Sequence, residues 1–241
     1  MQKWGGVIEK SSPEKFDFHR EDIILKPYIP SNIKVFVLSK TGSKPMYNIL
    51  NKQQVKSVGE KKWDQYFSIT QNQWKLIHSL PFSTTKNTKL QWFQFRVNQH
   101  ILTTNSFMFK INRLNSNMCI FCKAEEETIY HLLWDCPNVQ QLLLEFINLC
   151  NSKSIFIKLD PMTFIFGELN KSDLAKSFNV ILMSIKYYIY KMKCIENNLS
   201  IQGLLNELRY LLRALKHSAQ ESKSVDFNAN WKKWFFLMDN D

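Results

Sequence analysis

The segment CIFCKAEEETIYHLLWDC, residues 119–136, contains three cysteines and a histidine in the order Cys-x2-Cys-x8-His-x4-Cys. Two cysteines separated by two residues can direct both thiolates at one metal ion from a tight turn. Zn²⁺ favours four sulfur and nitrogen ligands in a tetrahedron. The predicted ligands are Cys119, Cys122, His131 and Cys136. Four protein ligands leave no open position for water, which favours a structural ion over a catalytic one.

The residues around the cluster fit this interpretation. The polar run before Cys119 favours tight turning, and Thr128 can cap a helical turn that directs His131 inward. Cys136 then lies at the end of that turn, next to Pro137. The predicted knuckle covers about residues 115–140. The alternative is that the four side chains are buried thiols and a core histidine without a metal.

The remaining cysteines, Cys150 and Cys194, are interpreted as ordinary core residues. An odd total of five cysteines, three of them clustered beside a histidine, favours metal binding in a reducing compartment over disulfides. The chain has no apolar run of about 18 residues, and its first ten residues lack the apolar core of a signal peptide. We therefore expect an intracellular protein, cytoplasmic and nuclear, without a membrane partner.

The fold class predicted from the whole chain is mainly α: a multi-helix domain with one small CCHC zinc knuckle. Six glycines in 241 residues and the lack of strand alternation favour helices. Residues 1–42 are predicted to be a linker or poorly ordered segment with one short strand around Ile33–Leu38. A helical region at 43–150 contains the knuckle, and a helical tail covers 151–241.

Two helical patterns position the candidate sites in the first region. One helix should begin near Gln71 and stop at Pro81. The next, within residues 83–102, has one apolar stripe and further aromatic residues off that stripe, so it should be largely buried. The stripe consists of Leu90, Phe93, Val97 and Ile101.

Two long helices are predicted in the tail, over residues 171–197 and 200–221. The face of the first that is expected to be buried has Val180 or Ile181, Ile185, Tyr188 and Met192. The face of the second that is expected to be buried has Leu204, Leu208, Leu211 and Leu215.

Positive charge is concentrated before the cluster. The formal net charge is +11, and residues 65–124 contain seven Lys or Arg and no Asp or Glu. Such a field attracts polyanions with salt-sensitive affinity, which makes RNA, DNA or both the predicted partners. A solvated basic face without a partner is the alternative. The candidate contacts are Lys86, Lys89, Arg96, Lys110, Arg113 and Lys123.

Several stretches together resemble a known family. These are TKLQWFQFRVNQHILTTN, LNSNMCIFC and ETIYHLLWDCP, and the resemblance extends over about residues 43–240. The chain is similar to the C-terminal zinc-binding region that follows the polymerase domain in LINE-type (non-LTR) retrotransposon reverse transcriptases. The resemblance implies a module that holds element RNA, target DNA or both during target-primed reverse transcription. It also implies the polymerase domain of the parent polyprotein as a partner.

The sequence does not predict an enzyme. The family's polymerase needs adjacent Asp residues in an aromatic-x-Asp-Asp turn, and this chain has no adjacent Asp pair and nothing that resembles the family's endonuclease. It therefore resembles the C-terminal part of such a polyprotein, with a non-catalytic, zinc-binding and nucleic-acid-binding role. The alternative is a helical scaffold or protein-interaction module that zinc stabilises and that has no nucleic-acid role.

Phe121 is a further candidate contact, because a residue between two ligands of a knuckle is directed toward the surface. There it could stack on an unpaired base. The alternative is that Phe121 packs back onto Trp134 or onto the helix after Cys136.

Overall fold

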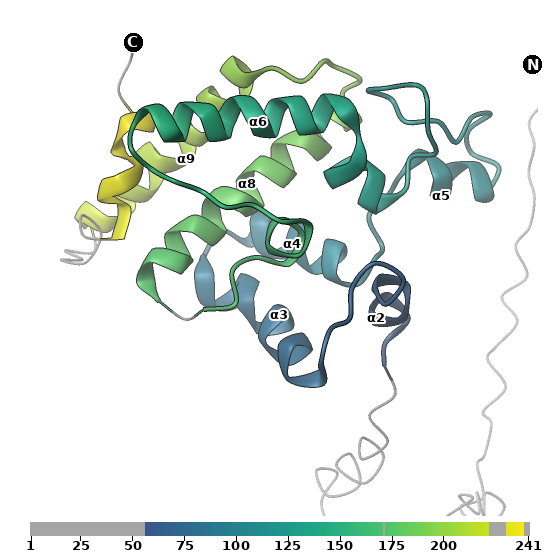
Figure 1. Ribbon diagram of the computed structural model, residues 1–241, viewed down its shortest axis with the longest axis horizontal. Coiled ribbons are helices and arrows are strands. Elements are labelled where there is room, and N and C mark those ends of the chain that lie inside the picture. The colour runs from purple at the N-terminus through teal and green to yellow at the C-terminus, as the bar shows by residue number, and fades with distance from the viewer. Residues whose placement is uncertain (1–55, 171, 222–229, 239–241) are drawn as a thin grey trace, which may run out of the picture. The chain divides into compact units, whose positions relative to one another are not determined.

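The described part of the protein is helical and contains no β-sheet (Figure 1). The computed structural model describes residues 56–170, 172–221 and 230–238. The predicted linker at 1–42, with its short strand, lies outside the described residues. The prediction of a mainly α fold with one small CCHC element is confirmed.

The helical segments of the described residues are, in chain order, α2 (Val58–Trp63), α3 (Gln71–Thr84), α4 (Thr88–Asn98), α5 (Asn105–Lys110), the π-helix η1 (His131–Asp135), α6 (Pro137–Ser152), α7 (Pro161–Phe166), α8 (Asp173–Cys194), α9 (Ile201–Glu221) and the 3-10 helix η2 (Lys232–Leu237). The described residues belong to one compact unit. The boundary expected between residues 150 and 151 lies inside α6, and helices on both sides of it share one core.

Helix α8 is the central element of this core. It packs against α3, α4, α9 and η1, and every residue from 180 to 186 is buried. The predicted stripe is buried, but so is the opposite side of the helix, because neighbours cover α8 all round. The helix covers residues 173–194, a little less than the predicted 171–197. None of the described helices is both long and apolar enough to cross a membrane.

Helix α9 lies against α8 with a stripe that differs slightly from the predicted one. Leu204 and Leu208 are buried as expected, but the third fully buried leucine is Leu212. Leu211 and Leu215 are only half-buried. Because α9 also packs against α6 and η2, its buried face is turned from the one that the sequence pattern indicates.

Pro81 does not stop α3, contrary to the prediction. The helix continues through it to Thr84. A proline has no N–H to donate to the carbonyl four residues earlier, which here belongs to Ile77. The Asn98 side chain supplies the missing donor, with Nδ2 donating to Ile77 O at 3.1 Å. A residue from α4 therefore compensates for the break, which a local pattern cannot reveal.

Helix α4 begins behind Asn87, whose Oδ1 accepts from the N–H groups of Lys89 (3.0 Å) and Leu90 (3.4 Å). The predicted stripe is buried as far as Val97, but Ile101 is 58% exposed because the helix ends at Asn98. Trp92 is 65% exposed, so α4 is not as fully buried as its composition suggests.

A polar network lies within the core where α4, α7 and α8 meet. The Lys186 side chain is fully buried, and its Nζ donates to Gln94 Oε1 and to Ile165 O, both at 2.6 Å. Gln94 Nε2 donates in turn to Asn98 Oδ1 (2.8 Å) and Ile165 O (2.9 Å). Burial holds the pKa of Lys186 well below its ordinary value. The described residues place no carboxylate on this amine.

Candidate metal centre

The first two candidate ligands lie on a small folded loop between α5 and η1. Its arms pair through the bridge between Met118 and Glu126, and the Cys119 N–H donates to Glu125 O at 2.7 Å. Lys123 closes the turn by donating to Cys119 O at 2.9 Å, with φ of 56°. This left-handed residue reverses the chain just after Cys122, so both thiols face the same interior.

The other two ligands come from a π-helical turn. Thr128 Oγ1 accepts from the His131 N–H at 3.0 Å, as expected for a cap, and the His131 side chain is buried. The Cys136 N–H donates to His131 O at 2.9 Å, an i→i+5 bond. This wider turn brings His131 and Cys136, which have four residues between them, to the same side of the turn. Cys136 then precedes Pro137, the first residue of α6.

The four side chains converge. One ligand atom from each of Cys119, Cys122, His131 and Cys136 lies within 4.8 Å of all the others. The Sγ atoms of Cys119 and Cys136 are 3.8 Å apart, and Cys122 Sγ is 3.4 Å from His131 Nε2. A tetrahedral zinc with Zn–S of about 2.3 Å and Zn–N of about 2.0–2.1 Å requires about 3.8 Å and 3.6 Å. A disulfide would need about 2.05 Å. This cluster could hold a metal ion.

The contact between two of the thiols favours deprotonation of Cys136 before Cys119. Cys119 Sγ donates to Cys136 Sγ. This contact, together with burial, raises the pKa of Cys119 above its ordinary value, and the same contact lowers the pKa of Cys136. A bound cation would override this difference by stabilising every thiolate, because only the thiolate binds metal.

The imidazole of His131 is positioned for binding through Nε2. Its Nδ1 is buried and lies 3.2 Å from Glu125 Oε2, although outside hydrogen-bonding geometry. A hydrogen bond from Nδ1 to this carboxylate would fix the tautomer that leaves Nε2 free for a cation. The Glu125 side chain itself is largely exposed.

Glu127 is a fully buried carboxylate that holds the loop in place, and the sequence analysis did not single it out. Its oxygens accept from the Asn105 N–H at 2.8 Å and the Ile120 N–H at 3.0 Å. Lys193 Nζ from α8 lies 3.6 Å away. One side chain therefore ties the start of α5, the cysteine turn and α8 together. In the sequence it is one of three consecutive glutamates, so no local signal distinguishes it.

We expect Glu127→Gln to lower the free energy of unfolding by about 1–3 kcal/mol, because the amide NH₂ would face one of two buried N–H donors. Lys193 would also be left without its counter-ion. Urea unfolding followed by circular dichroism measures the change. Glu126→Gln is the matched control, since Glu126 is half-exposed and its carboxylate contacts the side chains of Ser106 and Lys110 rather than backbone N–H groups. Equal stability of the two variants would contradict this role of Glu127.

The predicted nucleic-acid contacts lie on different elements. Lys86 and Lys89 are exposed at the start of α4, Lys110 and Arg113 at the end of α5 and just beyond it, and Lys123 in the cysteine turn. These five cations are accessible to a polyanion. Arg96 is half-buried, with its guanidinium 5.6 Å from the Tyr190 ring centroid.

Phe121 is half-buried and packs against the core. Its carbonyl accepts from Asn138 Nδ2 at 2.9 Å, and its side chain lines a pocket of about 270 Å³ with Asn138 and Leu142 of α6. This placement corresponds to packing against the helix after Cys136 rather than to a free stacking surface.

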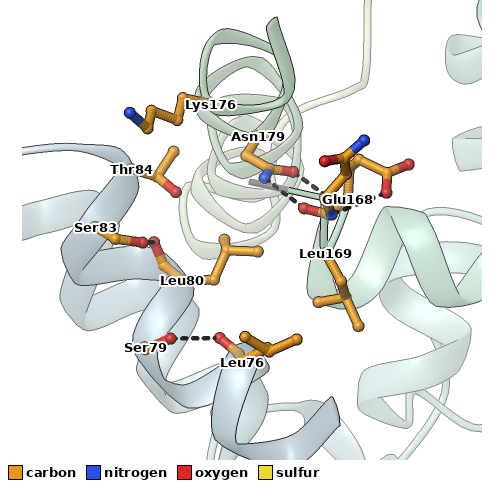
Figure 2. Close-up of a pocket in the computed structure, with 10 residues that line it drawn as sticks. Leu76, Ser79, Leu80, Ser83, Thr84, Glu168, Leu169, Lys176 and Asn179 are labelled. Carbon is orange, nitrogen blue, oxygen red and sulfur yellow. Dashed lines mark hydrogen bonds between the residues drawn. The ribbon is translucent and has the colours of Figure 1, made fainter. Parts of the chain in front are cut away.

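The other cysteines and the cavity drawn in Figure 2 offer less chemistry. Cys150 is buried, and Cys194 is exposed at the end of α8. A cavity of about 370 Å³ lies between α3, the connection from α7 to α8 and the start of α8. Figure 2 shows the residues that line it. The Ser79 and Ser83 hydroxyls there donate to carbonyls of their own helix, and Asn179 is bonded to the Glu168 backbone. The side-chain polar groups of Ser79, Ser83 and Asn179 are therefore already used within the fold.

No family model, curated protein or solved structure matches this chain. Its function is therefore inferred from the geometry of the cluster and from the surface around it.

Proposed function

We propose that this protein is a non-catalytic, zinc-binding helical module that binds nucleic acid, as in the C-terminal region of LINE-type reverse transcriptases. The observation that carries the proposal is the convergence of three thiols and one imidazole, with all four ligand atoms within 4.8 Å of one another. Zn²⁺ is the metal that this ligand set and these separations suit best. Four protein ligands would close the tetrahedron, which supports a structural role.

Surface charge supports the nucleic-acid part of the proposal. Five of the six predicted cations are exposed, and residues 65–124 contain no Asp or Glu. Phosphate contacts by such cations position a protein on RNA or DNA without reading the sequence. The resemblance to LINE-type proteins supports element RNA and target DNA as ligands and the polymerase domain of the parent polyprotein as a further partner.

Exposed apolar residues favour a second candidate function, that of a protein-interaction module in which zinc only stabilises the helices. Around α5, large apolar side chains remain exposed beside the knuckle. They are Ile101, Phe107, Phe109, Ile111 and Leu114. Grouped exposed apolar residues often mark a protein contact.

Nucleic-acid binding separates the two functions. We expect the full chain to bind a hairpin RNA with an affinity that falls steeply with salt. Lys86→Glu combined with Lys89→Glu should lower the log–log salt slope by about 0.7–0.9 for each phosphate that is no longer neutralised. Fluorescence anisotropy over a salt series measures both quantities. The matched control reverses two exposed lysines outside the acid-free stretch, Lys153 and Lys158.

Two outcomes would count against the proposal. If the zinc-loaded protein binds no RNA or DNA at low salt, the interaction module is favoured instead. If the paired substitutions at Lys86 and Lys89 behave like the control pair, the start of α4 is not the contact surface.

A further inference from the structure

A groove outside the metal centre joins the start of α4 to the faces of α8 and α9. It encloses about 630 Å³, within the usual range for a ligand site. Its lining combines cations with tyrosines: Lys86 and Lys89 from the start of α4, Tyr187 and Lys191 from α8, and Tyr210 from α9. The first two belong to the acid-free stretch, whereas the others come from the C-terminal tail.

Two of the groove's cations are available to a ligand. Within the described residues, no carboxylate lies at ion-pair distance from Lys86 or Lys89, and both are exposed. Lys191 is different, because its Nζ lies 2.8 Å from Glu207 Oε2, and Glu207 also lines the groove. The net charge of the lining is therefore positive, and its uncompensated part lies at the α4 end.

Exposed aromatic rings lie beside these cations. Tyr210 is 77% exposed on the solvent side of α9. Trp92 is 65% exposed and lies three residues after Lys89 and four before Arg96, so the three share one side of α4. Trp92 is supported edge-on by Phe95, with ring centroids 5.6 Å apart. Supported, exposed rings next to cations are the arrangement on which unpaired bases stack while phosphates are neutralised.

Tyr187, which lines the groove from α8, is held in place by a neighbouring ring, and Arg96 is engaged elsewhere. The Tyr187 ring contacts Phe93 edge-on with centroids 5.5 Å apart, and Arg96 covers Tyr190. The start of α4 does not itself supply the site, because the Asn87 side chain already accepts from two of its N–H groups. The lysines and the aromatic rings are therefore the recognition groups.

We propose that this groove, together with Trp92 next to Lys89 on α4, binds a single strand of nucleic acid, with phosphates at Lys86 and Lys89 and bases stacked on Trp92 and Tyr210. This inference rests on the proposed nucleic-acid function and adds the C-terminal helices to the contact surface. A paired duplex keeps its bases stacked inside, so it can use the lysines but not the rings. The groove therefore selects unpaired strands.

The test uses the zinc-loaded full chain with an unstructured oligouridylate, an oligodeoxythymidylate of equal length and a duplex of equal length. Trp92→Ala and Tyr210→Ala should each weaken binding of the single strands by about 5- to 150-fold and leave duplex binding nearly unchanged. Trp92→Phe should recover most of the affinity. Phe156→Ala, which removes a ring that is 85% exposed outside the groove, is the matched control.

The outcomes are distinguishable. If the wild type binds single strands and both alanine variants equal the Phe156 control, the groove is not the site, although the proposed function stands. Equal weakening on single strands and duplex would also overturn stacking. If the wild type binds no nucleic acid, the proposed function itself fails. Alanine is the best helix former and both positions are exposed, so circular dichroism should show unchanged helicity.

Discussion

Removal of zinc should unfold about residues 115–140 and leave α8 and α9 helical. The cysteine turn is held by few backbone bonds, and an ion bound by four ligands would link it to η1 and α6. Binding of structural zinc contributes about 10–16 kcal/mol in zinc-finger peptides at neutral pH, and this free energy is coupled to folding. Since α8 is buried mostly against other helices, the C-terminal core should remain folded without the ion.

Native mass spectrometry should detect one zinc per chain in the wild type and none in Cys122→Ser or Cys136→Ser. Hydrogen exchange of these variants, or of chelated protein, should accelerate selectively in the cysteine loop and η1. Cys194→Ser is the control, because Cys194 is an exposed cysteine outside the cluster. A metal-free wild type with the same exchange protection as the metal-loaded protein would refute the zinc site.

Lys186→Ala is expected to lower the free energy of unfolding by about 3–5 kcal/mol. The substitution leaves a cavity where α4, α7 and α8 meet and removes a donor from Gln94 Oε1 and Ile165 O. Lys186→Met fills most of the space, so its cost should be smaller, about 1–3 kcal/mol for Gln94 Oε1 left without its donor, since Ile165 O still accepts from Gln94 Nε2. Urea unfolding at one pH should show that Lys186→Ala is less stable than Lys186→Met, and that both are less stable than the wild type.

The pH dependence tests the charge of Lys186. A neutral amine has two N–H donors, which matches its two acceptors. Since burial lowers its pKa in the fold, the unfolded chain binds more protons between that lowered pKa and about 10.4. The wild type should therefore gain stability relative to Lys186→Met as the pH rises through this range. Exposed Lys153→Met should show no such trend, and a constant difference for Lys186→Met would contradict the lowered pKa.

The sequence predicted those features that depend on residues close together in the chain. The four candidate ligands follow from their spacing, and the long tail helices follow from apolar periodicity to within a few residues. The Thr128 cap before His131 follows from the same kind of short-range hydrogen bonding.

What the sequence did not reveal depends on partners distant along the chain. Pro81 remains inside α3 because Asn98 supplies a donor from another helix. In the sequence, Lys186 does not differ from the other lysines of the same predicted helix. Its partners Gln94 and Ile165 come from α4 and α7. The exposure of Trp92 likewise depends on which side of α4 its neighbours cover, and no periodicity within α4 specifies that.

The π-turn between His131 and Cys136 reverses the usual relation between helix propensity and stability. An α-helix turns about 100° per residue, so five steps would rotate Cys136 about 140° away from His131. The wider turn reduces that offset, and it does so against the intrinsic preference of the backbone for i→i+4 bonding. Substitutions at positions 132–135 that raise helix propensity would normally stabilise a protein. Here they would separate two ligands, so a sequence of lower helix propensity is the better one for this turn.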